Sequence, residues 1–178
     1  MEPEEQLRTW VRLYTERLVR LAYTYVRDQA TAEDRVQDAF IQAYASMNQL
    51  KNPGNPFPWL ARIVINECRS FRRKGWREVT VSVLPERSRA GVEETYLRDA
   101  EFREVHHALQ SLPAKYRTPI ILFYFEGLST QDIAEVLETN AGTVRTRLAR
   151  GRKLLSRLLQ EGEDDELRPE TQGCKTLL

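Results

Sequence analysis

Apolar residues recur three and four positions apart along most of this sequence, and this spacing restricts the fold more than any other feature. The first run of such residues is Leu7, Trp10, Val11, Tyr14, Leu18, Leu21, Ala22 and Tyr25. Residues at this spacing lie on one side of an α-helix. The chain has only 8 glycines and 8 prolines among its 178 residues, and it is rich in helix formers. We therefore expect an all-α protein.

Turn and capping residues divide the pattern into separate helices in the N-terminal half. The first helix is expected over about residues 6–27. Thr31–Asp34 has the residue order of a capping box, so the second helix should begin at Thr31 and end near Met47. Asn55 followed by Pro56 suits the start of a third helix. The core stripe of that helix would be Leu60, Ile63, Val64, Cys68 and Phe71.

The C-terminal half contains a second set of helical patterns. Apolar stripes predict helices over about residues 99–112 and 113–125. Ser129–Asp132 repeats the capping-box order and should begin a short helix. Asn140 suits the cap of a long last helix that should end near Leu159.

Between these two halves the periodicity is lost. Pro85, Ser88 and Gly91 are typical of a linker, so we expect two small helical domains, at residues 1–76 and 98–160, joined by a flexible linker at 77–97. Residues 161–178 are first acidic and then polar, and we expect them to form a disordered tail.

Positive charge is concentrated in two blocks, although the formal net charge is only +1. The first block has one acid, Glu67, among the basic residues Arg62, Arg69, Arg72, Arg73, Lys74 and Arg77. The second has no acid among Arg145, Arg147, Arg150, Arg152, Lys153 and Arg157. Two separate basic blocks favour two contacts with a polyanion. The alternative is that each block is a solvated helix face.

The segment from Ser129 to Leu155 has the pattern of a helix–turn–helix. A short helix with a small inward residue, Ala134, leads through a tight turn to a longer basic helix, which in this motif enters the major groove of DNA. Its inner face would be Val144, Leu148, Gly151 and Leu155. Its outer face would be Gly142, Arg145, Thr146, Ala149, Arg150 and Lys153. A basic helical hairpin that binds no nucleic acid is the alternative.

Enzymatic, metal and membrane functions find little support in the sequence. His106 and His107 are adjacent and point to different sides of a helix, and Cys68 and Cys174 belong to no metal-binding cluster. No nucleophile motif or phosphate loop is present. No apolar run is long enough to span a bilayer, and the acidic N-terminus does not resemble an export signal. We expect a cytoplasmic protein that is not an enzyme and has no cofactor or metal.

Several short motifs in the two halves are more specific than helical spacing. The C-terminal motifs are Leu112–Arg117, Tyr124–Ser129, Ile133–Ala134 and Gly142–Leu148. The N-terminal motifs are Ala32–Asp34, Gln37–Asp38, Phe40, Trp59–Leu60, Ile63, Asn66 and Arg72–Arg73. The first set is similar to region four, and the second to region two, of sigma-70 family RNA polymerase sigma factors. The two regions follow one another with no recognisable region three between them, which resembles the extracytoplasmic-function (ECF) group of that family.

The resemblance implies a transcription initiation factor with three working surfaces. Residues that would dock on the clamp helices of RNA polymerase are Asp34, Gln37, Asp38 and Ile41. Residues that would read the promoter −10 element are Arg62, Asn66, Arg69 and Arg73. Residues that would read the −35 element are Asn140, Ala141, Gly142, Thr143, Arg145, Thr146, Ala149, Arg150 and Lys153. The implied partners are the polymerase core, through its clamp helices and flap, promoter DNA and an anti-sigma factor, membrane-anchored or not.

Three positions depart from the usual pattern of the family. Glu138 stands where the family often has glycine, Ser70 where it often has aspartate, and Ala141 where glutamate is common. Trp59 suits either base stacking or core packing, with core packing favoured by its place beside the apolar stripe. The main rival function is a stand-alone helix–turn–helix regulator whose N-terminal half senses a ligand or dimerises.

Overall fold

The computed structural model describes residues 2–79 and 100–166, and these residues form helices and turns with no strand. The expectation of an all-α protein is thus confirmed. The helices are α1 (Pro3–Val26), α2 (Gln29–Ala45), the 3₁₀ turn η1 (Met47–Gln49), α3 (Phe57–Val79), α4 (Ala100–Ser111), α5 (Ala114–Ile120), the π-helical turn η2 (Ile121–Phe125), α6 (Thr130–Val136) and α7 (Ala141–Glu166). No helix in the described ranges is long and apolar enough to cross a membrane.

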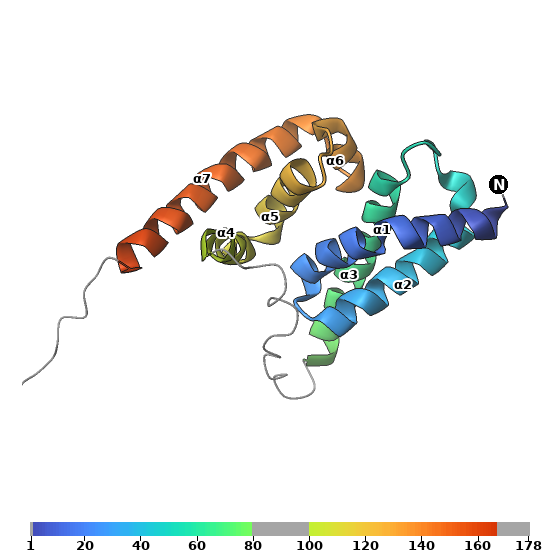
Figure 1. The fold of residues 1–178 in the computed structure, drawn as a ribbon, viewed down its shortest axis with the longest axis horizontal. Helices are drawn as coiled ribbons and strands as arrows, with labels where there is room; N and C mark the ends of the chain where they lie inside the picture. The colour runs from blue at the N-terminus through green and yellow to red at the C-terminus, as the bar shows by residue number, and fades with distance from the viewer. Residues whose placement is uncertain (1, 80–99, 167–178) are drawn as a thin grey trace, which may run out of the picture.

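Helices α1, α2 and α3 pack against one another in a group that we call the N-terminal bundle (Figure 1). Its interior is filled by large apolar side chains, among them Leu18, Leu21, Val36, Leu60 and Ile65. Most of the predicted stripes lie in this core. Val11 and Phe71 were expected inside and are 40% and 41% exposed. Phe71 instead lies beneath the guanidinium of Arg35, 5.1 Å from its ring centre.

The start of α2 differs from the prediction. The predicted capping box at Thr31–Asp34 is wrong, because the helix begins two residues earlier and Asp28 is its N-cap. The Asp28 carboxylate accepts hydrogen bonds from the backbone N–H and the hydroxyl of Thr31, at 2.9 and 2.7 Å. A carboxylate satisfies the free amides of a first turn better than a hydroxyl and also favours the positive helix end. Asp28 therefore took the place that the sequence pattern assigned to Thr31.

Two other helix ends also lie elsewhere than predicted. Helix α3 begins at Phe57, and Leu60 donates its N–H to the carbonyl of Pro56, so Pro56 precedes the helix. Helix α7 continues to Glu166, seven residues beyond the predicted end near Leu159. The added segment contains good helix formers, Gln160, Glu161, Glu163 and Glu166, beside the poorer formers Gly162, Asp164 and Asp165. Extending an existing helix needs no new nucleation, so it costs far less than starting one. Most of the predicted linker and residues 167–178 of the tail lie outside the described residues.

Helices α4 to α7 form the second group, the C-terminal bundle, with α7 along its outer side (Figure 1). The predicted capping box at Ser129 is confirmed, since Ser129 and Asp132 satisfy one another's backbone amides. Gly127 ends the preceding turn with φ +67°. At Gly151 the backbone of α7 comes close to α5, where an added Cβ would lie 2.8 Å from Ile120 and 3.3 Å from Tyr116.

Candidate nucleic-acid interface

The start of α7 is the best-defined part of the candidate DNA surface. The side chain of Asn140 accepts a hydrogen bond of 2.8 Å from the backbone N–H of Thr143, so Asn140 caps the helix as predicted. Val144, Leu148 and Gly151 are buried where α7 packs against α5 and α6, and Leu155 is half-buried. This packing turns the opposite side of α7 to the solvent.

The residues predicted to touch the −35 element lie on that outer side. Those that are exposed are Asn140, Gly142, Arg145, Thr146, Ala149, Arg150 and Lys153, and Ala141 and Thr143 are half-buried. The Thr146 hydroxyl donates to the carbonyl of Gly142 at 3.0 Å. Arg145 and Arg150 make no salt bridge among the described residues, so both guanidinium groups are available to a ligand.

A shallow cavity of about 540 Å³ lies beside this surface. It is lined by Lys115, Tyr116, Asn140, Gly142, Thr143, Thr146, Arg147 and Arg150. Lys115, Tyr116 and Arg147 were absent from the predicted −35 set. Only the tertiary structure brings Lys115 and Tyr116 to α7, because they belong to α5; Arg147 was visible in advance as part of the second basic block.

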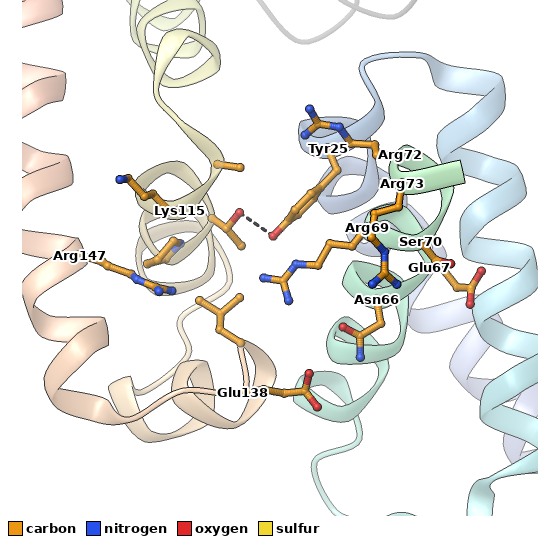
Figure 2. A pocket seen from close by; sticks show the side chains of 14 residues that line it. Tyr25, Asn66, Glu67, Arg69, Ser70, Arg72, Arg73, Lys115, Glu138 and Arg147 are labelled. Atoms are coloured by element: carbon orange, nitrogen blue, oxygen red, sulfur yellow. Dashed lines mark hydrogen bonds between the residues drawn. The ribbon is translucent and has the colours of Figure 1, made fainter. Parts of the chain in front are cut away.

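The four residues predicted to read the −10 element lie along α3 and face the C-terminal bundle. Arg62 forms a salt bridge of 2.5 Å with Glu138, which follows α6. Asn66, Arg69 and Arg73 line a cleft of about 1000 Å³ between the two bundles. Figure 2 shows these three side chains on one side of the cleft and Lys115 and Arg147 on the other.

This cleft is strongly basic. Its cationic residues are Arg69, Arg72, Arg73, Lys115 and Arg147, and its acidic residues are Glu67 and Glu138. Five cations against two carboxylates produce a positive potential that attracts an anionic chain such as a nucleic-acid backbone.

The predicted polymerase-binding face lies on the outer side of α2. Asp34, Gln37 and Ile41 are exposed, and the Ile41 side chain is 69% exposed. Asp38 is half-buried and forms a salt bridge of 2.9 Å with Arg35. An apolar residue beside carboxylates in an exposed position suits a partner surface that is basic around an apolar centre.

Five polar contacts connect the two bundles, and sequence reasoning missed all of them. They are Arg17–Glu126, Thr24–Arg117, Tyr25–Thr118, Arg27–Gln110 and Arg62–Glu138. The one feature of the sequence that could have indicated these contacts is a set of polar side chains at the C-terminal end of α1, where the apolar stripe ends. Helix spacing alone does not tell which other helix such residues contact.

Arg117 is the most buried charged residue among these contacts, with 3% of its surface exposed. Its guanidinium donates hydrogen bonds to the carbonyls of Gln110 and Leu112 in its own bundle and of Thr24 in the other. Burial, with the nearby charge of Arg27, lowers the pKa of Arg117 to about 10. The side chain therefore stays charged at neutral pH, held by carbonyl oxygens.

The described structure is thus that of a two-part helical protein with an exposed, basic helix–turn–helix, which defines a DNA-binding protein. Comparison with known protein families identifies which class of DNA-binding protein this is. Residues 10–78 match sigma-70 region 2, and residues 102–155 match sigma-70 region 4.

Individual relatives agree with these matches. The chain is 33% identical to the RNA polymerase sigma-H factor of Pseudomonas aeruginosa, over 83% of this chain and 82% of that one. It is 36% identical to the sigma factor SigV of Bacillus subtilis, over 76% and 80%. The solved structure of the sigma factor RpoE of Bartonella quintana, in complex with the anti-sigma factor NepR, matches with a TM-score of 0.74 and 30% identity, over 86% of this chain and 96% of that one.

The chain belongs to the extracytoplasmic-function group of RNA polymerase sigma factors, as the motifs predicted. Sigma factors direct RNA polymerase to promoters, so this protein acts in promoter-specific initiation of transcription.

Proposed function

We propose that the three surfaces described above divide the work of promoter recognition. Helix α7 reads the −35 element, the basic face of α3 reads the −10 element, and the outer face of α2 docks on the polymerase clamp helices. The observation that carries this assignment is the exposed, acid-free basic face of α7 behind a capped helix–turn–helix.

Chemistry and placement support the role of α7. Arg145 and Arg150 project from its exposed side, and a free guanidinium binds the O6 and N7 atoms of guanine with two hydrogen bonds. Ala149 and the methyl group of Thr146 suit thymine methyl groups. Lys153, further along the helix, suits a phosphate.

On α3 the same reasoning supports contact with single-stranded DNA. Arg69 and Arg73 provide charge for the backbone, and Asn66 provides an amide that both donates and accepts hydrogen bonds. Trp59 contributes less to this surface, because it is half-buried and its ring meets that of Trp10 edge to face at 5.9 Å. Holding an extruded base costs a few kcal/mol, which binding contacts offset without ATP.

The proposal extends to partners and place of action. The related RpoE was solved with NepR and the related CnrH with the cytosolic domain of CnrY, at 26% identity and a TM-score of 0.62. We infer that an anti-sigma factor controls this chain as well, and that the flap of the polymerase holds the C-terminal bundle. The protein acts in the cytoplasm and performs no catalysis of its own.

The test uses holoenzyme reconstituted with core polymerase and a promoter that this holoenzyme selects from a random library. Arg150→Ala should weaken binding by about 1–3 kcal/mol, which corresponds to the loss of one two-bonded base contact. Arg157→Ala removes an equal charge from an exposed position of α7 outside the proposed surface and serves as the control. Equal affinity of both variants would refute the role of α7.

The rival function, a stand-alone helix–turn–helix regulator, gives a different result in the same experiment. A regulator of that kind binds its duplex site without polymerase. The sigma factor needs the core to hold both bundles before it opens DNA, so the isolated protein should show no strand opening by permanganate footprinting.

A further inference from the structure

We propose that the free protein closes on itself, with the C-terminal bundle covering the −10-reading face of α3, and that Glu138 stabilises this closed form. This inference rests on the proposed role of α3. It concerns the state of the protein before it meets core polymerase, and it requires no inhibitor protein.

The covering contact is direct. Helix α6 packs against α3, and Glu138, just after α6, forms the 2.5 Å salt bridge with Arg62. Arg62 is the first residue of the proposed −10 surface. While the salt bridge is formed, one amino group of the Arg62 guanidinium is engaged and its charge is partly neutralised, so Arg62 binds a phosphate or a base less well.

The remaining −10 residues line the cleft between the bundles, where Asn66 and Arg69 are half-buried and Arg73 is exposed. Asn66, Arg69 and Arg73 face the cleft whose opposite wall is built by Lys115 and Arg147 (Figure 2). A DNA strand that entered would have to pass between the bundles. The −35 surface of α7 is different, because its seven exposed residues point to solvent. Closure therefore covers one DNA surface and leaves the other open.

The backbone conformation of Glu138 indicates that its side chain has a specific role. Glu138 has φ +51°, the left-handed region that side chains with a Cβ disfavour and glycine adopts freely. Glycine is the easier residue for this turn. A glutamate at such a position is explained when its carboxylate contributes something that glycine lacks, and the contribution visible here is the salt bridge to Arg62.

The other cross-bundle contacts act in the same direction. The Tyr25 and Thr118 hydroxyls meet at 2.8 Å in a buried position. Arg17 pairs with Glu126 at 2.7 Å, and the Glu126 side chain is only 6% exposed. Buried polar groups of this kind lose these partners when the bundles separate, and water must replace them. These contacts favour the closed form.

The Arg62–Glu138 pair is about half exposed, so breaking it should shift the balance between closed and open forms modestly, by about twofold to fivefold. When the closed form predominates, affinity for a ligand of the open form rises by the same factor. Glu138→Gly removes the carboxylate and also relieves the turn, so the C-terminal bundle stays folded.

The first experiment measures binding of the full chain, without polymerase, to a short fluorescein-labelled single-stranded DNA of random sequence, by fluorescence anisotropy. Glu138→Gly should bind about twofold to fivefold more tightly than the wild type. Adding Thr118→Val and Glu126→Gln should increase the effect. Glu135→Ala is the matched control, because it removes one exposed carboxylate from α6 that makes no hydrogen bond or salt bridge among the described residues.

The second experiment measures compactness by small-angle X-ray scattering. Glu138→Arg places two cations together and should increase the radius of gyration, and the exchanged pair Arg62→Glu with Glu138→Arg should restore it. Variants that stay as compact as the wild type and bind single-stranded DNA no more tightly than the Glu135→Ala control overturn the proposal. These experiments can be told apart from a test of the proposed function. If the proposed function is wrong, the wild-type protein does not bind core polymerase.

Discussion

Arg117 shows at the scale of one residue how the two bundles depend on each other. The carbonyl oxygens that accept its hydrogen bonds come from the last turn of α4, from the residue before Pro113, and from the end of α1. Carbonyls at helix C-termini have no partner within their own helix and carry partial negative charge. One guanidinium satisfies several of them at once, which a lysine ammonium with its compact geometry does less well.

We therefore expect Arg117→Met, which keeps the length and removes the donors, to destabilise the protein by about 3 kcal/mol. The loss leaves buried carbonyls without partners. Urea unfolding followed by circular dichroism measures the change. Arg147→Met serves as the control, because Arg147 lies at the cleft wall, is half-buried and makes no salt bridge among the described residues. Equal stability of the two variants would contradict the structural role of Arg117.

At the scale of elements, helix ends are set by local side chains. Helix α2 begins at Asp28, whose pKa is lowered by the hydrogen bonds from the hydroxyl and backbone N–H of Thr31. A carboxyl with a lowered pKa in the folded state stabilises that state above its unfolded pKa, and the contribution is lost as the pH falls through the folded value.

Asp28→Ala should therefore lower the melting temperature at neutral pH, and the difference from wild type should shrink as the pH falls below about 4. Asp28→Asn is the matched control, because asparagine caps a helix without titrating. Thermal melts over a pH series give the result. A difference between wild type and Asp28→Ala that does not change with pH would show that the carboxylate charge plays no part.

Helices α5 and α7 pack closely against each other at Gly151. Gly151 lets the two helices approach, because any side chain there meets Ile120 and Tyr116. Helix α7 is thereby fixed against α5 at the point where Lys115 and Tyr116 border the candidate DNA surface. The position of α7 thus depends on a residue that touches no DNA.

At the scale of the whole molecule, the proposed assignment requires polymerase to hold two bundles that carry different promoter surfaces. Docking on α2 through Asp34 is the proposed first contact. Fixing both bundles lowers the ordering cost of engaging both promoter elements. The cross-bundle contacts imply that core binding also has to separate α6 from α3.

Asp34→Lys should abolish core association in gel filtration and open-complex formation by permanganate footprinting, since it reverses a charge that is proposed to face the clamp helices. Its helicity by circular dichroism should be unchanged, because Asp34 is exposed and makes no salt bridge among the described residues. Asp34 is a better test position than Asp38, which pairs with Arg35.

Glu33→Lys makes the same charge change one residue away, at an exposed position where the carboxylate accepts a hydrogen bond from Gln29 of its own helix. It should bind core normally. If the Asp34 variant also associates with core and opens the promoter, α2 is not the docking face.

The sequence alone determined the helical class, the order of the elements, the capped helix–turn–helix and the family. These properties depend on residues close together in the chain: apolar residues at helical spacing, Ser129 with Asp132, and Asn140 with Thr143. It also determined which side of α7 is exposed, because the inner residues Val144 and Leu148 fix the opposite face. The sequence did not decide between two neighbouring candidate N-caps, Asp28 and Thr31, and the structure shows that α2 begins after Asp28.

Only the tertiary structure decided how the two bundles meet. The salt bridge between Arg62 and Glu138 joins residues 76 positions apart, and the contact between Tyr25 and Thr118 joins residues 93 apart. Helical periodicity tells which side of a helix is apolar, and it carries no information about which distant polar residue lies opposite. The burial of Arg117 and the placement of the proposed −10 residues at the cleft follow from that long-range packing.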